Sequence, residues 1–370
     1  MLLFLTGILL FGAYAILIWF YKKAWDGLGL YEPQTYPAQP PFLSLIVAAR
    51  NEAETLPRLL RSLKTQTYPA DRFELIVVDD HSTDGTAVLL QKEPSVKYLP
   101  LCEGVTSKKK AIAAGIAAAN GDIIITTDAD CVASPQWLQT LSSFYVEKGA
   151  AFIAAPVKYM YRNNLLEMFQ TLDFLTLQGI TAASVTAKFH SMCNGANLAY
   201  TKAAFHAVNG FSGIDAVASG DDMLLMHKIW KQHPHSVFYL KSKAAIVETA
   251  PMPTWKDFFW QRIRWASKTT AYDDKRIFWA LLLVYLFNAF FVVLLGAGFW
   301  EPRYWLLAVV LWVAKTAVEL PFVYAVARFF DQQKSVRYFF LFQPLHILYT
   351  VLIGAISQTG SYQWKGRKTK

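Results

Sequence analysis

Apolar residues gather in four long runs near the two ends of the chain, and the residues between them hold no such run. The first run, residues 2–21, has no charged residue and is long enough to cross about 30 Å of hydrocarbon as a helix. The other runs cover residues 277–299, 304–326 and 338–357. The pattern predicts a transmembrane anchor in residues 1–21 and a membrane region of about three segments in residues 277–357.

Basic residues predict which side of the membrane the central block occupies. Lys22 and Lys23 follow the first run directly, whereas Met1 alone precedes it. Since basic residues favour the cytoplasmic side, we expect the N-terminus outside and the block after the anchor in the cytoplasm. A cleaved signal peptide is the alternative, but the run lacks a basic start and a small-residue cleavage site. The expected location is therefore the inner (plasma) membrane, with several spans.

The C-terminal residues conflict with four full spans. An even number of crossings would return the C-terminus to the outer side, yet the basic tail of residues 358–370 favours the cytoplasm. One segment is therefore expected to be re-entrant or interfacial, and residues 304–326, which Pro321 could bend, are the candidate. A lone Lys315 near mid-bilayer would cost about 2.5–3.5 kcal/mol. Glu319, four residues later, can pair with it as a buried ion pair, and a polar lining of an acceptor path is the alternative.

Between the membrane runs, residues 42–250 alternate buried strands with amphipathic helices. Short apolar runs predict the strands, and leucine or alanine repeats at helical spacing predict the helices. Strands are expected at residues 43–49, 73–78 and 123–127, and helices at 54–65, 86–91 and 108–120. This alternation predicts an α/β domain with a mostly parallel sheet that helices cover on both faces. Ligands of such sheets bind at the carboxyl ends of the strands.

Two of these strands end in pairs of aspartates. Asp128 and Asp130 can hold a hard divalent cation, Mg²⁺ or Mn²⁺, whose shell is completed by water and phosphate oxygens. A solvated loop is the alternative for an isolated Asp-x-Asp. Asp79 and Asp80, which follow the second strand, can accept hydrogen bonds from a nucleobase or a ribose.

Further candidate contacts with a nucleotide flank these strand ends. The backbone from Ala49 to Glu52 can frame a base, and an ordinary strand-to-helix turn is the alternative. Thr83 or Asp84 is expected to cap the helix that follows the second strand. Lys108 opens the alanine-rich helix and can reach a phosphate, whereas the rest of its lysine run is expected to be a solvated charge run.

A third acidic pair, Asp221 and Asp222, precedes an apolar helical start. Displacement at an anomeric carbon by a hydroxyl needs a base that takes the proton, and a carboxylate with a raised pKa suits that role. Helix capping is the alternative role for this pair.

Residues 254–276 predict an amphipathic helix in the membrane surface. Apolar side chains recur there at helical spacing, and basic residues occupy the other positions. Gln261, Arg264 and Trp265 form a Gln-x-x-Arg-Trp sequence within this segment. The planar guanidinium of Arg264 can bind a diphosphate, and lipid anchoring alone is the alternative.

Composition narrows the class of protein. The chain is 54% hydrophobic and 15% aromatic, which is more than one soluble domain in 370 residues requires. Its basic residues, which give a formal charge of +9, flank the apolar runs or the candidate phosphate contacts. Membrane lipids and an anionic donor are therefore expected as partners, and nucleic acid is not. Three scattered cysteines without zinc-ligand spacing indicate free thiols in a reducing compartment.

Taken in order, these motifs resemble the membrane-integrated branch of glycosyltransferase family 2. The motifs are the acidic pair at 79–80, Asp-x-Asp at 128–130, Asn-Gly-Ala-Asn at 194–197, Gly-Asp-Asp at 220–222 and Gln-x-x-Arg-Trp at 261–265. The branch includes cellulose, chitin, hyaluronan and poly-N-acetylglucosamine synthases and ceramide glucosyltransferase. The resemblance implies a Rossmann-like GT-A fold and an inverting, metal-dependent transfer from a UDP-sugar.

The resemblance also implies roles for single residues. Asp222 would be the general base, and Asp130 together with Asp128 would bind the metal. The nucleotide-sugar site would comprise Ala49, Glu52, Asp79, Asp80, Lys108, Asp128, Gln261, Arg264 and Trp265. The acceptor site would comprise Asn194, Asn197, Asp221 and Trp265. Asp221 stands where many members of the branch carry glutamate.

The expected function is a single sugar transfer to a lipid-linked or membrane-associated acceptor, either lipid or glycan. A processive polysaccharide synthase is the first alternative, although four or fewer spans make a poor polymer channel for one subunit. A non-catalytic membrane partner that retains the fold is the second, and the presence of Asp130, Asp222 and Arg264 argues against it. The sequence predicts no particular sugar or oligomeric state.

Overall fold

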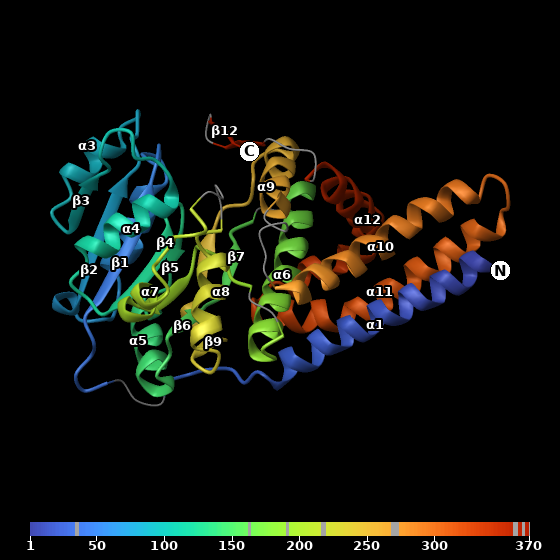
Figure 1. The fold of residues 1–370 in the computed structure, drawn as a ribbon, viewed down its shortest axis with the longest axis horizontal. Coiled ribbons are helices and arrows are strands. Elements are labelled where there is room, and N and C mark those ends of the chain that lie inside the picture. The colour runs from blue at the N-terminus through green and yellow to red at the C-terminus, as the bar shows by residue number, and fades with distance from the viewer. Residues whose placement is uncertain are drawn as a thin grey trace. The chain divides into compact units, whose positions relative to one another are not determined.

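The computed structural model describes residues 1–33, 37–161, 164–189, 192–215, 220–267 and 274–357, together with the backbone of 362–364 and 367–369. The chain divides into two compact units, whose elements are labelled in Figure 1. The sheet unit comprises Gly29–Met160 and Ser191–Ala250, and the helical unit comprises Met1–Leu28, Tyr161–His190 and Pro251–Lys370. The sequence placed residues 161–190 inside the 42–250 block, whereas their helix packs with the membrane helices.

The sheet unit is built on a mixed seven-stranded sheet with the strand order β3-β2-β1-β4-β8-β6-β9. Its strands are β1 (Leu43–Ala49), β2 (Phe73–Asp79), β3 (Val96–Pro100), β4 (Ile123–Asp128), β6 (Phe152–Ala154), β8 (Leu198–Thr201) and β9 (Val237–Tyr239). β1 pairs in parallel with β2 and β4, and β2 pairs in parallel with β3. β8 runs antiparallel to both β4 and β6. The predicted mostly parallel α/β sheet is confirmed.

Strand register brings the predicted site residues to one edge of this sheet. Ala49 is the register partner of Asp79, and Ala48 is the register partner of Asp128. The apolar runs before these positions are fully buried, as Val47 and Val77 illustrate. Because parallel strands in register end at the same edge, their terminal residues lie side by side.

Helices and a small second sheet complete the sheet unit. The helices are α2 (Leu56–Lys64), α3 (Thr86–Gln91), α4 (Lys108–Ala118), α5 (Trp137–Lys148), α7 (Lys202–Ala207) and α8 (Met223–Gln232), with short 3₁₀ turns at Ala70–Arg72 and Lys243–Ala245. The second sheet has the order β5-β10-β7, formed by Val132–Ala133, Val247–Thr249 and Val157–Tyr159. In α4, Gly115 allows close packing on β1, since a Cβ there would lie 2.5 Å from a methyl carbon of Ile46.

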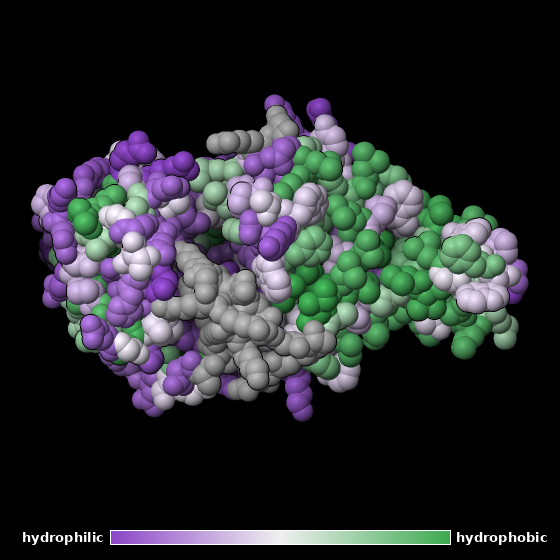
Figure 2. All heavy atoms as spheres, turned by 90° about the horizontal axis from the view of Figure 1, so that it is seen from above, coloured by the Kyte–Doolittle hydropathy of each residue, from purple (hydrophilic) through white to green (hydrophobic). Residues whose placement is uncertain are grey.

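The helical unit contains four helices that are long and apolar enough to cross a membrane. Its elements are α1 (Leu2–Gly27), α6 (Leu165–Thr186), α9 (Trp255–Ala266), α10 (Lys275–Ala297), α11 (Arg303–Phe329), the 3₁₀ turn Gln333–Tyr338, α12 (Phe339–Ile356), β11 (Tyr362–Trp364) and β12 (Arg367–Thr369). Hydrophobic side chains gather on the visible surface of these helices in Figure 2. Leu9 of α1 and Leu306 of α11, for example, are 72% and 66% exposed. Such apolar exposure suits a lipid environment and agrees with the predicted membrane segments.

One expectation about the membrane region is not supported. Residues 304–326 were the candidate for a re-entrant segment bent at Pro321, but α11 is a single helix of 27 residues that contains Pro321 without a break. Its fully buried Lys315 donates to Glu319 and to Gln343, with 2.7 Å between the bonded atoms in each case. The hydroxyl of Tyr14 in α1 also donates to Glu319. The buried ion pair is therefore confirmed, and it joins three helices.

Gly179 determines how closely α6 packs against α11. A Cβ at this position would lie 2.4 Å from a methyl carbon of Val326 and 2.9 Å from the ring of Phe322. We expect Gly179→Ala to lower the free energy of unfolding by about 1–3 kcal/mol, because overpacking outweighs the gain of at most about 1 kcal/mol in helix propensity. Gly12→Ala in α1 is the matched control, since a Cβ there meets nothing within 4 Å. Thermal unfolding in detergent measures both variants, and equal melting temperatures would contradict the expectation.

Candidate active site

The loops that follow β1 and β2 are joined by hydrogen bonds at the carboxyl edge of the sheet. The backbone amide of Glu52 donates to the hydroxyl of Thr86 at 2.8 Å, and the amide of Ala53 donates to Asp84 at 3.1 Å. The side chain of Asn51, whose φ is 53°, accepts from the amide of Thr83 at 2.8 Å. These bonds hold the predicted Ala49–Glu52 segment in one conformation beside the end of β2.

Asp79 and Asp80 are buried and bonded within this edge. A carboxylate oxygen of Asp79 accepts from the backbone amide of Ser82 at 3.1 Å. The carboxylate of Asp80 accepts from the hydroxyl of Thr106 at 3.1 Å, and Arg50 donates to the backbone carbonyl of Asp80 at 2.6 Å. The pair therefore shapes the turn in which it stands. Its contact with a nucleotide stays a prediction.

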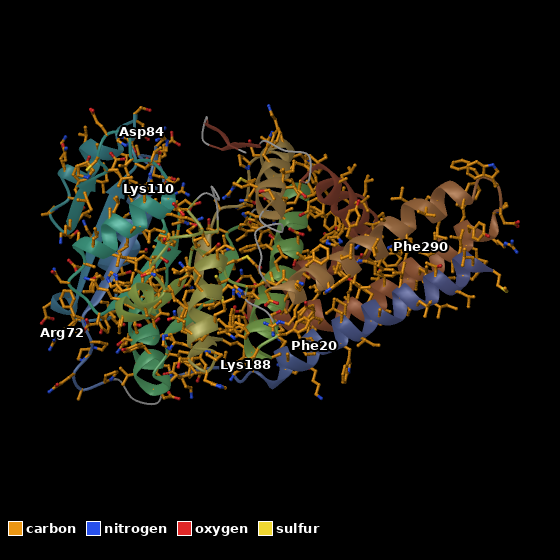
Figure 3. All side chains as sticks on the ribbon, in the orientation of Figure 1. Phe20, Arg72, Asp84, Lys110, Lys188 and Phe290 are labelled. Atoms are coloured by element: carbon orange, nitrogen blue, oxygen red, sulfur yellow. The ribbon has the colours of Figure 1, made fainter. Side chains whose placement is uncertain are left out.

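Asp84 accepts a hydrogen bond from the start of α3, but Gly85 is the N-cap residue of that helix, so the prediction of Thr83 or Asp84 as the cap is wrong by one position. The carboxylate of Asp84 accepts from the backbone amide of Thr86 at 2.9 Å, in the first turn of α3, where Figure 3 labels it. Burial raises the pKa of the Asp84 carboxyl, but hydrogen bonds from Thr86 and Ala53 outweigh that effect and hold the pKa below its usual value.

Lys108 links two carboxylates that lie far apart in the sequence. Its ammonium is 2.7 Å from Oδ1 of Asp128 and 3.0 Å from Oδ2 of Asp221. Burial lowers the pKa of Lys108, but the charges of Asp128, Asp221 and Asp222 outweigh it and raise the pKa well above the usual value. Lys108 is therefore a permanent cation at the carboxyl edge of the sheet.

The rest of the lysine run divides into two environments. Lys110 is exposed, as predicted, and is labelled in Figure 3. Lys109 is 4% exposed, and its ammonium donates to the backbone carbonyl of Ile214. The expectation of a solvated run is therefore wrong for Lys109, because the helical repeat turns this position toward the protein interior.

Asp222 lies next to the Asn194–Asn197 loop and has the capping role that the sequence gave as its alternative, while its role as a base stays a prediction. Its Oδ1 accepts from the backbone amide of Met223 at 2.7 Å and caps α8, while its Oδ2 accepts from the amide of Gly195 at 3.2 Å. A Cβ at Gly195 would lie 3.1 Å from the ammonium of Lys108 and 3.3 Å from Asp221. Glycine at 195 thus lets the loop backbone approach the charged cluster closely.

Asn197 does not have the surroundings that an acceptor ligand requires. It is completely buried, and its amide nitrogen donates to the carbonyls of Pro156 and Ala245, each at 2.8 Å. Its side-chain oxygen accepts from the indole of Trp137 at 3.0 Å. The acceptor-binding prediction for Asn197 is corrected on this ground, because an acceptor cannot reach a side chain without exposed surface.

Asp128 and Asp130 fit a divalent cation by their donor chemistry and by their electrostatics. Burial, followed by the charges of Asp128 and Glu52, raises the pKa of Asp130 to about 6, although Thr249 donates to its carboxylate at 3.1 Å and lowers it. Burial and the neighbouring carboxylates both disfavour a charged Asp130, and a bound cation would offset both effects. Within the residues that the structure describes, no group of three or more His, Cys, Asp or Glu forms a metal cage. Two carboxylates suit Mg²⁺ or Mn²⁺ completed by water and phosphate oxygens.

The Gln-x-x-Arg-Trp sequence lies on α9 in the helical unit, where a neighbouring arginine anchors it. The guanidinium of Arg262 is 2.6 Å and 2.8 Å from a carboxylate oxygen of Asp173 in α6, and both side chains are buried. The same guanidinium lies 4.1 Å from the ring centroid of Trp265. Arg262 therefore holds α9 on α6 and supports Trp265. The predicted contact of Gln261, Arg264 and Trp265 with a diphosphate stays a prediction.

Sequence reasoning missed the partnership of Arg262 with Asp173. The available signal was position, because Arg262 follows Trp255, Phe258 and Phe259 at helical spacing and so occupies the apolar face of α9. Asp173 is likewise a charged residue within an apolar stretch. A charge on a buried helical face needs a countercharge, but the sequence does not say which residue provides it.

Removing one member of this pair should weaken the helical unit. We expect Asp173→Asn to cost about 3–5 kcal/mol, because it leaves the guanidinium of Arg262 buried without its countercharge. The exposed Asp257→Asn on α9 is the control, with an expected cost of about 1 kcal/mol or less from a weakened helix start. Thermal melting in detergent distinguishes them, and a melting temperature for Asp173→Asn equal to that of the wild type would refute a stabilising pair.

Comparisons with known proteins match this chain to glycosyltransferases. Residues 44–208 match the model of the family described as Glycosyl transferase family 2. A probable glycosyltransferase of Bacillus subtilis, YdaM, is 24% identical over 76% of this chain and 74% of its own length. An undecaprenyl-phosphate 4-deoxy-4-formamido-L-arabinose transferase of Pseudomonas savastanoi is 32% identical over 29% of this chain and 32% of its own length. The chain thus matches less than a third of that relative.

A solved structure shares the fold. The mannosyltransferase PcManGT of Pyrobaculum calidifontis, in complex with GDP-mannose and Mn²⁺, superposes with a TM-score of 0.61 at 20% identity. The superposition covers 95% of this chain and 99% of that one. At this identity the likeness supports the GT-A fold that the sequence implied, and it leaves the substrates of this chain open.

Proposed function

We propose that the chain, whose residues 44–208 match the model of glycosyl transferase family 2, is a membrane-associated member of that family and an inverting glycosyltransferase. It would move a sugar from a UDP-sugar to a hydroxyl of a lipid-linked or membrane-associated acceptor. The observation that carries the proposal is the meeting of Lys108 with Asp128 and Asp221 at the carboxyl edge of the sheet, beside Asp222.

Each group at this edge has a role in the proposed reaction. The acceptor oxygen attacks the anomeric carbon, the bond from that carbon to the leaving phosphate oxygen breaks, and UDP departs. Asp222 takes the proton of the acceptor hydroxyl. Asp128 and Asp130 would hold Mg²⁺ or Mn²⁺, which supplies positive charge against the leaving diphosphate. Lys108 adds a further cation to the phosphate side of the site.

A single transfer to a lipid-linked acceptor is the preferred form of this function. One relative carries undecaprenyl phosphate in its name, and the helical unit has four candidate spans. A processive polysaccharide synthase is the alternative. Incubation of membranes with a labelled donor separates the two, because one organic-soluble product is expected for a single transfer. A size ladder of polymer would overturn that part of the proposal.

The donor is tested by a panel of labelled UDP-sugars and GDP-sugars on purified protein in lipid nanodiscs. We expect metal-dependent release of UDP from one UDP-sugar. GDP-mannose is included because the mannosyltransferase of the same fold was solved with it. Turnover of a GDP-sugar alone would replace UDP in the proposal. Absence of turnover and of nucleotide binding across the panel would favour a non-catalytic membrane partner.

The proposed orientation places the sheet unit in the cytoplasm at the inner (plasma) membrane. The argument is the position of Lys22 and Lys23 in the last turns of α1, since basic residues stay on the cytoplasmic side. Labelling of single introduced cysteines in intact cells tests it. Exposed positions of the sheet unit should react only after the membrane is permeabilised.

A further inference from the structure

The ammonium of Lys108 occupies the carboxylate that the proposed function gives to the metal. It lies 2.7 Å from Oδ1 of Asp128, and it also lies 3.0 Å from Asp221. A divalent cation of the Mg²⁺ type binds carboxylate oxygens at about 2.0–2.1 Å. An ammonium bound to Oδ1 repels a divalent cation that approaches the same oxygen. Even a metal on the other oxygen would meet a carboxylate whose charge Lys108 partly neutralises.

The geometry allows this ammonium to move. Its side chain is 24% exposed and that of Asp128 is 39% exposed, so neither is locked in the interior. The absence of a side chain at Gly195, whose Cβ would lie 3.1 Å from the ammonium, leaves room beside it. Asp221 is 11% exposed and stays within reach as a second partner. The lysine can therefore leave Asp128 while it keeps a carboxylate next to it.

We propose that Lys108 couples metal binding to donor binding. Without a donor, its ammonium stands in for the cation at Asp128 and lowers the affinity of the site for a free metal ion. A nucleoside diphosphate attracts the ammonium to its phosphate oxygens and releases Asp128 for the metal. This inference rests on the proposed function, because it takes the diphosphate donor and the Asp128–Asp130 metal site from it.

Thermodynamic linkage makes the inference quantitative. If a nucleoside diphosphate raises the affinity for the metal by some factor, the metal must raise the affinity for the nucleotide by the same factor. Lys108→Met keeps a side chain of similar length and removes the charge. We expect this variant to bind Mn²⁺ at least about tenfold more tightly than the wild type in the absence of nucleotide, which corresponds to about 1.4 kcal/mol. It should bind UDP more weakly and gain less Mn²⁺ affinity when UDP is added.

The experiment measures Mn²⁺ binding to the full chain in detergent, by the loss of the free-ion electron paramagnetic resonance signal, with and without UDP. Lys110→Met is the matched control, because Lys110 is exposed and lies in the same lysine run, and its removal causes the same change in net charge. Its Mn²⁺ affinity should equal that of the wild type within about twofold, since exposed charges are screened by salt. Lys108→Gln, which keeps a polar head without charge, should reproduce the effect of Lys108→Met.

The outcomes separate the inference from the function on which it rests. One result would overturn the coupling alone. In that result the wild type binds Mn²⁺ and UDP, and the Lys108 variants keep the wild-type melting temperature but bind Mn²⁺ no more tightly. An equal gain in the Lys110 variant would also overturn the coupling, by showing a general charge effect. A wild type that binds neither Mn²⁺ nor any nucleoside diphosphate would overturn the proposed function and the coupling together.

Discussion

Asp222→Asn is expected to abolish sugar transfer while the protein still binds its donor. The substitution removes the group that would take the proton of the acceptor hydroxyl, and general-base catalysis contributes about 10²–10⁴-fold to rate. Turnover should therefore fall by about that factor, with a smaller change in the apparent affinity for the donor. Labelled-product formation measures the rate, and nucleotide binding by calorimetry measures the affinity.

The structure explains why the fold should tolerate this change. Asp222 caps α8 by accepting from the backbone amide of Met223, and asparagine caps helices about as well as aspartate. The second oxygen of Asp222 accepts from the amide of Gly195 at 3.2 Å, and that one bond is lost in the variant, because an amide nitrogen cannot accept it. Asp71→Asn, an exposed change in the same unit, is the control and should keep full activity. Unchanged turnover of the Asp222 variant would remove the assigned base.

Asp130→Asn should have the second-largest effect on turnover. It should lower the activity without lowering the thermal stability. The carboxylate is a proposed metal ligand, so metal-dependent turnover should fall by at least about 10²-fold, as for loss of one preorganised electrostatic contact. Burial and the charges of Asp128 and Glu52 raise the pKa of Asp130 to about 6. A neutral side chain relieves that cost, so the melting temperature without metal should stay equal or rise.

Thr249→Val should lower the metal affinity of the site by less than Asp130→Asn does. The hydroxyl of Thr249 donates to Asp130 at 3.1 Å without being a proposed ligand itself. Loss of such an orienting hydrogen bond costs about 10–100-fold in metal affinity. Mn²⁺ titration of both variants with UDP present should rank them in the order wild type, Thr249→Val, Asp130→Asn. Full metal-dependent turnover in Asp130→Asn would exclude that residue as a ligand.

Local sequence patterns predicted many of the helices and strands in considerable detail. The apolar run at 43–49 matches β1 in both bounds, and residues 86–91 match α3. The aspartates at the ends of β2 and β4 were placed correctly at one edge, because parallel strands in register end together. Four candidate membrane helices among the described residues were also predicted from the sequence, since a span needs an unbroken apolar run. These features depend on neighbours within a few residues.

Long-range contacts were decided by the tertiary structure alone. Lys108 and Asp221 lie 113 positions apart in the sequence, and nothing in that spacing predicts that their charged atoms are 3.0 Å apart. The ion pair of Arg262 with Asp173 was equally impossible to predict from local sequence. The motif around Asn197 suggested a ligand, whereas the structure buries this side chain and bonds it to Trp137. Helix α6 reads as part of the central block but packs with the membrane helices. A local pattern determines which face of an element is apolar, whereas the partner of that face is chosen by the packing of the whole chain.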